Sequence, residues 1–233
     1  MLFVSHNLTR TRARIAAAEQ AAGQTAGEVR LLAVSKTKSE GDIRAAATAG
    51  QRDFGENYLQ EAVRKIVSLQ GLRLTWHFIG AIQSNKTRDI ARHFHWVHTL
   101  DRYKIARRLS DQCPADKVLN VLIQVNIDAD PAKSGVAPGA AQELVEATKA
   151  LPGLAVRGLM TILERNGNAE ESFQRMHVLF NDLRRSQDPQ WDTLSMGMSA
   201  DMELAIANGA TLVRIGTDIF GPRAARIGEE AAP

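Results

Sequence analysis

The chain has 233 residues, which is enough to bury a full-sized hydrophobic core, and one barrel domain is possible at this length. Hydrophobic residues make up 44% of the chain and charged residues 24%, the composition of an ordinary soluble globular protein. The formal net charge is only +3, and no basic run is interleaved with aromatic residues, so the sequence gives little support to nucleic-acid binding.

Cysteine content and hydropathy predict the compartment. The one cysteine, Cys113, cannot form an internal disulfide, which favours a reducing environment. No apolar stretch approaches the roughly 20 residues that a membrane-spanning helix needs, and the apolar start at residues 1–4 is too short for a signal peptide. We therefore expect a cytoplasmic protein without membrane contact. Because no long apolar stripe is apparent, we also expect a monomer.

Strand-like and helix-like segments alternate along the chain. A helical segment at about 5–22 comes first, and eight strand-like segments follow at 30–35, 51–54, 74–80, 95–99, 118–126, 154–160, 192–195 and 211–215. Each connection is long enough for a crossover helix, so the strands are expected to be parallel. The count of eight predicts an α/β protein with a single (β/α)8 TIM-type barrel over 1–233, a core at about 28–223 and an extra N-terminal helix.

The first strand ends in Lys36. A buried strand has no structural use for an ammonium group, because removing that charge from water is costly. Lys36 therefore either extends to solvent or serves chemistry at the mouth of the barrel, where catalytic and binding groups of such folds lie. Lysine forms imines with carbonyl ligands once its pKa is lowered, and Lys38 could supply the nearby charge.

The last two strands predict a phosphate site. Barrels often bind phosphate in the loops after strands seven and eight. Strand seven runs into Ser199, where a helix is expected to begin, so the hydroxyl and the first-turn N–H groups could donate to a phosphate. After strand eight, Gly216 permits close backbone approach and Thr217 adds a hydroxyl. Alone, each feature is typical of a cap or a turn; together they favour phosphate.

Other candidate sites are weaker. His93, His95 and His98 alternate with aromatic residues, but no cysteine pair or His-Glu-x-x-His helix accompanies them, so no metal site is predicted. Glu56 is the one carboxylate placed to act as a base, although a lone glutamate is usually a salt-bridge or capping partner.

Nine ordered motifs make the chain similar to a known family. They are AVSKTK at 33–38, FGENY at 54–58, WHFIG at 76–80, QSNK at 83–86, QVN at 124–126, KSG at 133–135, RGLM at 157–160, SMGMS at 195–199 and VRIGT at 213–217. Over about residues 30–223 the chain resembles the pyridoxal 5′-phosphate (PLP) homeostasis protein family, single-domain relatives of the alanine racemase N-terminal barrel.

The resemblance implies roles for particular residues. Lys36 would hold PLP as a Schiff base, and Arg214 would meet its pyridine nitrogen. The remaining cofactor-binding residues would be Asn57 and His77 around the ring and Ser199, Gly216 and Thr217 at the phosphate. Whether Lys133 or Lys38 forms a second PLP site is left open.

We expect a carrier rather than an enzyme, with no catalytic residues. An arginine cannot accept the ring proton, because its own pKa stays above ~12, so the ring would be a weak electron sink. The arginine alone does not decide, because alanine racemase, which the site resembles, is active with a similar arginine. In that enzyme a tyrosine from a C-terminal domain supplies a second acid–base group, and a chain ending at Pro233 is expected to have no room for that domain. The expected partners are PLP and, transiently, apo-PLP enzymes. The alternatives are a slow amino-acid racemase and a cofactor-free class I aldolase that uses Lys36.

Overall fold

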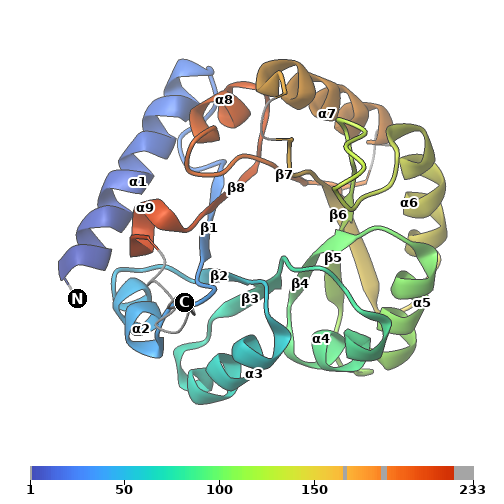
Figure 1. Cartoon of the computed structure of the whole chain (residues 1–233), viewed down its shortest axis with the longest axis horizontal. Helices are drawn as coiled ribbons and strands as arrows, with labels where there is room; N and C mark the ends of the chain where they lie inside the picture. Colours follow the sequence, from blue (N-terminus) through green and yellow to red (C-terminus); the bar gives the residue numbers. More distant parts are fainter. Residues whose placement is uncertain (1, 165–166, 185–187, 223–233) are drawn as a thin grey trace, which may run out of the picture.

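The computed structural model describes residues 2–164, 167–184 and 188–222. Eight parallel strands form a closed barrel in sequence order, and β1 pairs with both β2 and β8 (Figure 1). The strands are β1 (Arg30–Val34), β2 (Asp53–Glu56), β3 (Thr75–Phe78), β4 (Trp96–Leu100), β5 (Leu119–Gln124), β6 (Leu154–Met160), β7 (Thr193–Ser195) and β8 (Leu212–Ile215). The predicted barrel is confirmed, and each expected strand end lies within two residues of the observed one.

Helices form a ring around the barrel (Figure 1). They are α1 (Leu2–Ala21), α2 (Glu40–Thr48), α3 (Leu59–Ser68), α4 (Thr87–His93), α5 (Tyr103–Gln112), α6 (Ala141–Lys149), α7 (Ala169–Leu183), α8 (Met202–Ala207) and α9 (Thr217–Phe220), with short 3-10 turns η1 (Gln70–Leu72), η2 (Ser84–Lys86) and η3 (Pro138–Ala140). The extra N-terminal helix is α1, which packs beside α8 and α9. No helix in the described ranges is long and apolar enough to cross a membrane.

Helix α8 begins at Met202, so the expected helix start at Ser199 is wrong. Asp201 is the residue before the helix, and its carboxylate accepts the Met198 N–H at 2.6 Å. This bond closes a turn over 198–201 and leaves Ser199 in the loop, three residues before the helix. The first turn of α8 therefore does not follow directly on Ser199.

Side chains alternate between the two faces of each strand, as the pleat requires. On β1, Leu31 and Ala33 belong to the main core, whereas Leu32 and Val34 belong to a separate cluster with Ile79 and Leu212. A second small cluster contains Trp96, Leu122 and Met160, with Ile162 packed against it. The main core lies between the strands and the helices, and the two small clusters fill parts of the barrel interior.

Candidate functional site

A cavity of about 320 Å³ opens where the strands end. Six predicted site residues line it together, namely Lys36, Asn57, Ser199, Arg214, Gly216 and Thr217. Its other walls are Val34, Ile79, Met160, Ile162, Met198 and Ala200. The cavity thus combines one amine, one guanidinium, an amide and two hydroxyls with an apolar surface.

His77 does not line the cavity. Its ring is buried in the barrel interior, stacked on Trp96 with 5.4 Å between ring centroids. The ring nitrogens lie 3.0 Å from His98 Nε2 and 3.0 Å from Asp53 Oδ1. Burial lowers the pKa of His77, which favours the neutral imidazole. From the WHFIG motif, Ile79 reaches the cavity instead, because it lies two residues further along the same face of β3.

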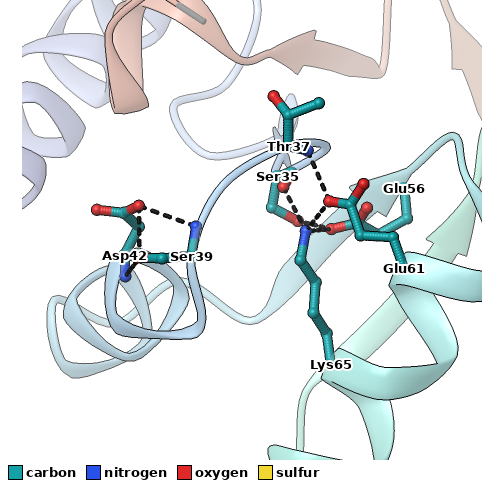
Figure 2. A network of polar contacts seen from close by, with 7 residues as sticks. All are labelled: Ser35, Thr37, Ser39, Asp42, Glu56, Glu61 and Lys65. Atoms are coloured by element: carbon teal, nitrogen blue, oxygen red, sulfur yellow. Dashed lines mark hydrogen bonds and ion pairs between the residues drawn. The ribbon is translucent and has the colours of Figure 1, made fainter. Parts of the chain in front are cut away.

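The loop that carries Lys36 is held on both sides by a buried polar cluster (Figure 2). Glu61 accepts the Thr37 N–H at 2.7 Å, and Lys65 Nζ donates to the Ser35 carbonyl at 2.8 Å. Thr37 has a φ of +63°, a left-handed conformation that is costly for a β-branched residue. The contacts on Ser35 and Thr37 therefore fix the backbone immediately before and after Lys36.

Lys65 is the centre of this cluster. The residue is 5% exposed, and besides the Ser35 carbonyl its ammonium contacts Glu56 at 2.8 Å and Glu61 at 2.5 Å. The Ser35 hydroxyl also donates to Glu56 at 2.6 Å, and burial raises the pKa of that carboxyl. Glu56 does not line the cavity, so its partners make it a structural residue rather than a base. Only the Glu61 and Lys65 spacing of four was visible in the sequence.

Lys38 lies outside the cavity wall. Its ammonium donates to the carbonyl oxygens of Phe220 at 3.1 Å, Gly221 at 3.0 Å and Pro222 at 2.7 Å. A cation at the carboxyl end of a helix is favourable, because the last carbonyl groups lack partners. Lys38 thus connects the Lys36 loop to the end of α9.

Lys133 also lies outside the cavity wall. Its ammonium donates to the Leu163 carbonyl at 2.8 Å, which joins the loop after β5 to the loop after β6. These contacts leave open whether Lys38 or Lys133 forms a second PLP site.

Arg214 is a buried cation with three hydrogen bonds to the barrel. Its guanidinium donates to the Ser195 carbonyl and hydroxyl, both at 2.9 Å, and to the Thr161 carbonyl at 2.8 Å. Burial lowers the pKa of Arg214 to about 10, so the group is still charged at neutral pH. The side chain therefore presents fixed N–H donors to the cavity and no acceptor.

Two glycines allow the strand ends to approach one another. A Cβ on Gly80 would stand 2.1 Å from the Asn57 carbonyl oxygen, and one on Gly216 would stand 3.2 Å from the Val34 carbonyl oxygen.

The side chain of Asn57 has a buried Oδ1 with no hydrogen-bond partner among the described residues. Asn57 lines the cavity, but this oxygen is itself almost fully covered by protein.

Arg14 of α1 holds the loop that contains Ser199. Its guanidinium donates to the Ser199 carbonyl at 3.3 Å, to Glu203 at 2.8 Å and to Asp218. Sequence spacing carries no signal of these contacts, because the partners of Arg14 lie near the other end of the chain. Arg14 therefore joins the loop that carries Ser199 to α9, whose first residue is Thr217.

Comparison with known proteins shows the family. A family model of the alanine racemase N-terminal domain matches residues 7–224. The pyridoxal phosphate homeostasis protein of Pseudomonas aeruginosa is 53% identical over 227 residues, covering 96% of this chain and 97% of the relative. The Escherichia coli protein of the same name is 50% identical over 227 residues, covering 94% and 97%. This chain belongs to the pyridoxal phosphate homeostasis protein family.

Solved structures agree with this family. PipY of Synechococcus elongatus, solved with PLP bound, has a TM-score of 0.79 and 34% identity, covering 94% of this chain and all of PipY. A protein from Bifidobacterium adolescentis described as unknown has a TM-score of 0.85 and 34% identity, covering 93% and 94%. Alanine racemase from Corynebacterium glutamicum has a TM-score of 0.68 at 18% identity, and this chain covers 62% of it, so that likeness concerns the fold alone.

Proposed function

We propose that this protein binds PLP through Lys36 and stores or delivers the cofactor in the cytoplasm, as a monomer, without robust catalysis. The observation that carries the proposal is the single cavity that joins Lys36, Arg214 and the hydroxyl-bearing loops around Gly216. The names of the homeostasis relatives and the PLP bound to PipY support it.

The donor set of the cavity fits PLP. The Lys36 amine would condense with the aldehyde group, forming a carbon–nitrogen double bond to Nζ and releasing one water. Ser199 and Thr217 would donate hydroxyl hydrogen bonds to the phosphate, while Val34 and Ile79 belong to the apolar wall for the ring. Asn57 would contact the ring from the same wall.

The surroundings of the cavity support a carrier over an enzyme. When bound, PLP supplies an electron sink, and that sink is strongest when its ring nitrogen is protonated. Arg214 can only donate there, so it cannot hold a proton on the nitrogen. The two tyrosines of the sequence, Tyr58 and Tyr103, do not line the cavity and are 52% and 45% exposed. A second acid–base group of the racemase type is therefore not in place among the described residues.

The first experiment is an absorption spectrum of the PLP-treated protein before and after borohydride, followed by peptide mass mapping. We expect a visible band that borohydride removes, and a reduced adduct on the peptide containing Lys36. Lys36→Ala should lack both, whereas Lys104→Ala, an exposed lysine on α5, should keep both. An adduct on other lysines alone would contradict the assignment.

A second experiment separates the carrier from the enzyme. The loaded protein is mixed with an apo-PLP enzyme, and recovered activity of that enzyme is compared with racemisation of L-alanine by the loaded protein alone. We expect reactivation without racemisation. Racemisation that disappears in Lys36→Ala would favour the slow racemase instead. Analytical ultracentrifugation at the working concentration checks the oligomeric state, and we expect a single species with the mass of one chain.

A further inference from the structure

A chain of hydrogen bonds crosses the barrel interior from Arg214 to Asp53. Arg214 Nη1 lies 2.9 Å from Ser195 Oγ, which lies 3.2 Å from His98 Nδ1. His98 Nε2 lies 3.0 Å from His77 Nδ1, and His77 Nε2 lies 3.0 Å from Asp53 Oδ1. Ser195, His98 and His77 are fully buried, so water does not compete for these contacts.

The chemistry of the two ends determines where each proton lies. A guanidinium can only donate and a carboxylate can only accept. Asp53 accepts from His77 Nε2, so a neutral His77 accepts at Nδ1 from His98 Nε2, and a neutral His98 accepts at Nδ1 the proton of Ser195 Oγ, which itself accepts from Arg214. His98 then donates through Nε2 to His77 Nδ1, and His77 donates through Nε2 to Asp53. With both imidazoles neutral, every bond in the chain is made when each ring carries its proton at Nε2.

The surroundings of the two histidines agree with neutral rings. Burial is the largest cause that lowers the pKa of His98, and the neighbouring His77, Arg214 and Arg30 lower it further. Burial also lowers the pKa of His77, against the opposing effect of Asp53. An imidazolium inside this chain would place a second positive charge next to Arg214.

The chain of hydrogen bonds also compensates the buried positive charge of Arg214. Within the described ranges no carboxylate lies at ion-pair distance from its guanidinium, although the charge of Asp201 acts on it from further away, and its other two acceptors are the backbone carbonyls of Ser195 and Thr161. Asp53 is the first residue of β2, at the opposite mouth of the barrel from the PLP cavity, and its side chain is 32% exposed. The aligned dipoles therefore connect the buried cation to a carboxylate across the barrel.

We propose that Ser195, His98 and His77 are positioning residues that hold Arg214 in one orientation and couple it to Asp53. The contact of Arg214 with the ring nitrogen of PLP rests on the proposed function. The arrangement of protons along Ser195, His98 and His77 does not. Affinity for PLP and the spectrum of the bound cofactor then depend on a hydrogen-bond acceptor at position 53, which does not line the cofactor cavity.

The first test uses the protein without PLP. Two-bond proton–nitrogen correlation spectra report the protonation of each imidazole, with His77 and His98 assigned from single variants. We expect both rings to be neutral with the proton on Nε2 at neutral pH. An imidazolium, or a proton on Nδ1 in either ring, would overturn the proposal whether or not the protein binds PLP.

The second test measures PLP affinity by absorbance titration and the wavelength of the bound band. Ser195→Ala removes the hydroxyl that Arg214 and His98 share, and we expect about tenfold weaker binding, the size of one charge-assisted hydrogen bond. Asp53→Leu removes the terminal acceptor, and we expect at least threefold weaker binding with a shifted band. Asp53→Asn keeps a carbonyl acceptor, so its PLP affinity and the wavelength of its bound band should equal those of the wild type.

The outcomes separate the two proposals. If Asp53→Leu binds PLP like the wild type and has the same band, the coupling to Asp53 is wrong. If Asp53→Asn is as defective as Asp53→Leu, hydrogen bonding is not the cause and the coupling is likewise wrong. If the wild type itself binds no PLP, the proposed function fails, while the imidazole spectra still decide the proton arrangement.

Discussion

Replacing Lys65 by methionine should loosen the loop that carries Lys36. The substitution keeps an unbranched side chain and removes the ammonium that contacts Glu56, Glu61 and the Ser35 carbonyl. Glu56 is fully buried, so it would be left as a buried carboxylate whose one remaining donor among the described residues is the Ser35 hydroxyl. Without Lys65, the contacts on both sides of Lys36 weaken together.

The size of the expected loss of stability follows from the burial of the Lys65–Glu56 ion pair. Removing one partner of a buried ion pair costs about 3–5 kcal/mol of unfolding free energy. We expect the lower end, about 3 kcal/mol, because burial already raises the pKa of Glu56 and the carboxyl can take up a proton. A domain of ordinary stability, roughly 5–15 kcal/mol, would stay folded. Because Thr37 has left-handed backbone, the released loop should relax and PLP affinity should fall.

The assay is urea unfolding of the protein without PLP, together with PLP titration. Arg64→Met is the matched control, since Arg64 is an exposed cation next to Lys65 on α3 and should change stability by under about 0.5 kcal/mol. Glu56→Gln combined with Lys65→Met should recover part of the loss, because it removes the unpaired charge. Equal stability of Lys65→Met and Arg64→Met would refute the reasoning.

Three further predictions concern the cavity wall and the barrel interior. Gly216→Ala should weaken PLP binding, measured by titration, because its Cβ would stand 3.2 Å from the Val34 carbonyl oxygen and displace the start of α9. Arg14→Ala should weaken PLP binding severalfold with a small change in melting temperature, because it releases the Ser199 carbonyl while its ion pairs are partly exposed. Burial lowers the pKa of His98 well below 6.5, so below about pH 6.5 the unfolded chain binds a proton there that the folded chain does not, and this residue should lower the free energy of unfolding by up to about 1.4 kcal/mol for each unit that the pH drops. His98→Gln should reduce the slope measured by urea unfolding by that amount, while the share of His77, whose pKa is also lowered, stays.

The sequence predicted the barrel well because its signals are local. Short apolar runs separated by helical periodicity occur eight times, and parallel strands bring their carboxyl ends to one mouth. The six cavity residues that were predicted all follow strands or lie at their ends. This part of the site needed no knowledge of packing.

Two expectations failed, the place of His77 in the cavity and the helix start at Ser199. The first depends on how deep a side chain lies in the barrel, and the second on a tertiary contact. His77 and Ile79 share a face of β3, and only the register of the closed barrel decides that Ile79 reaches the cavity. The β2–β3 pairing places His77 beside Gly55, one layer below the strand ends. Likewise Ser199 and Asp201 are both acceptable residues before a helix, and the contact of Asp201 with the Met198 N–H decides between them.

The residues that the sequence did not reveal share one property: each acts on the cavity through another residue. Arg14 acts through Ser199, Lys65 through the backbone around Lys36, and His98 through Ser195 on Arg214. Their partners are 185, 30 and 97 positions away in the sequence, so spacing carries no trace of them. A motif therefore identifies the groups that would touch the cofactor. The geometry of those groups is set by α1, α3 and the barrel interior, where substitutions should change affinity without removing any binding residue.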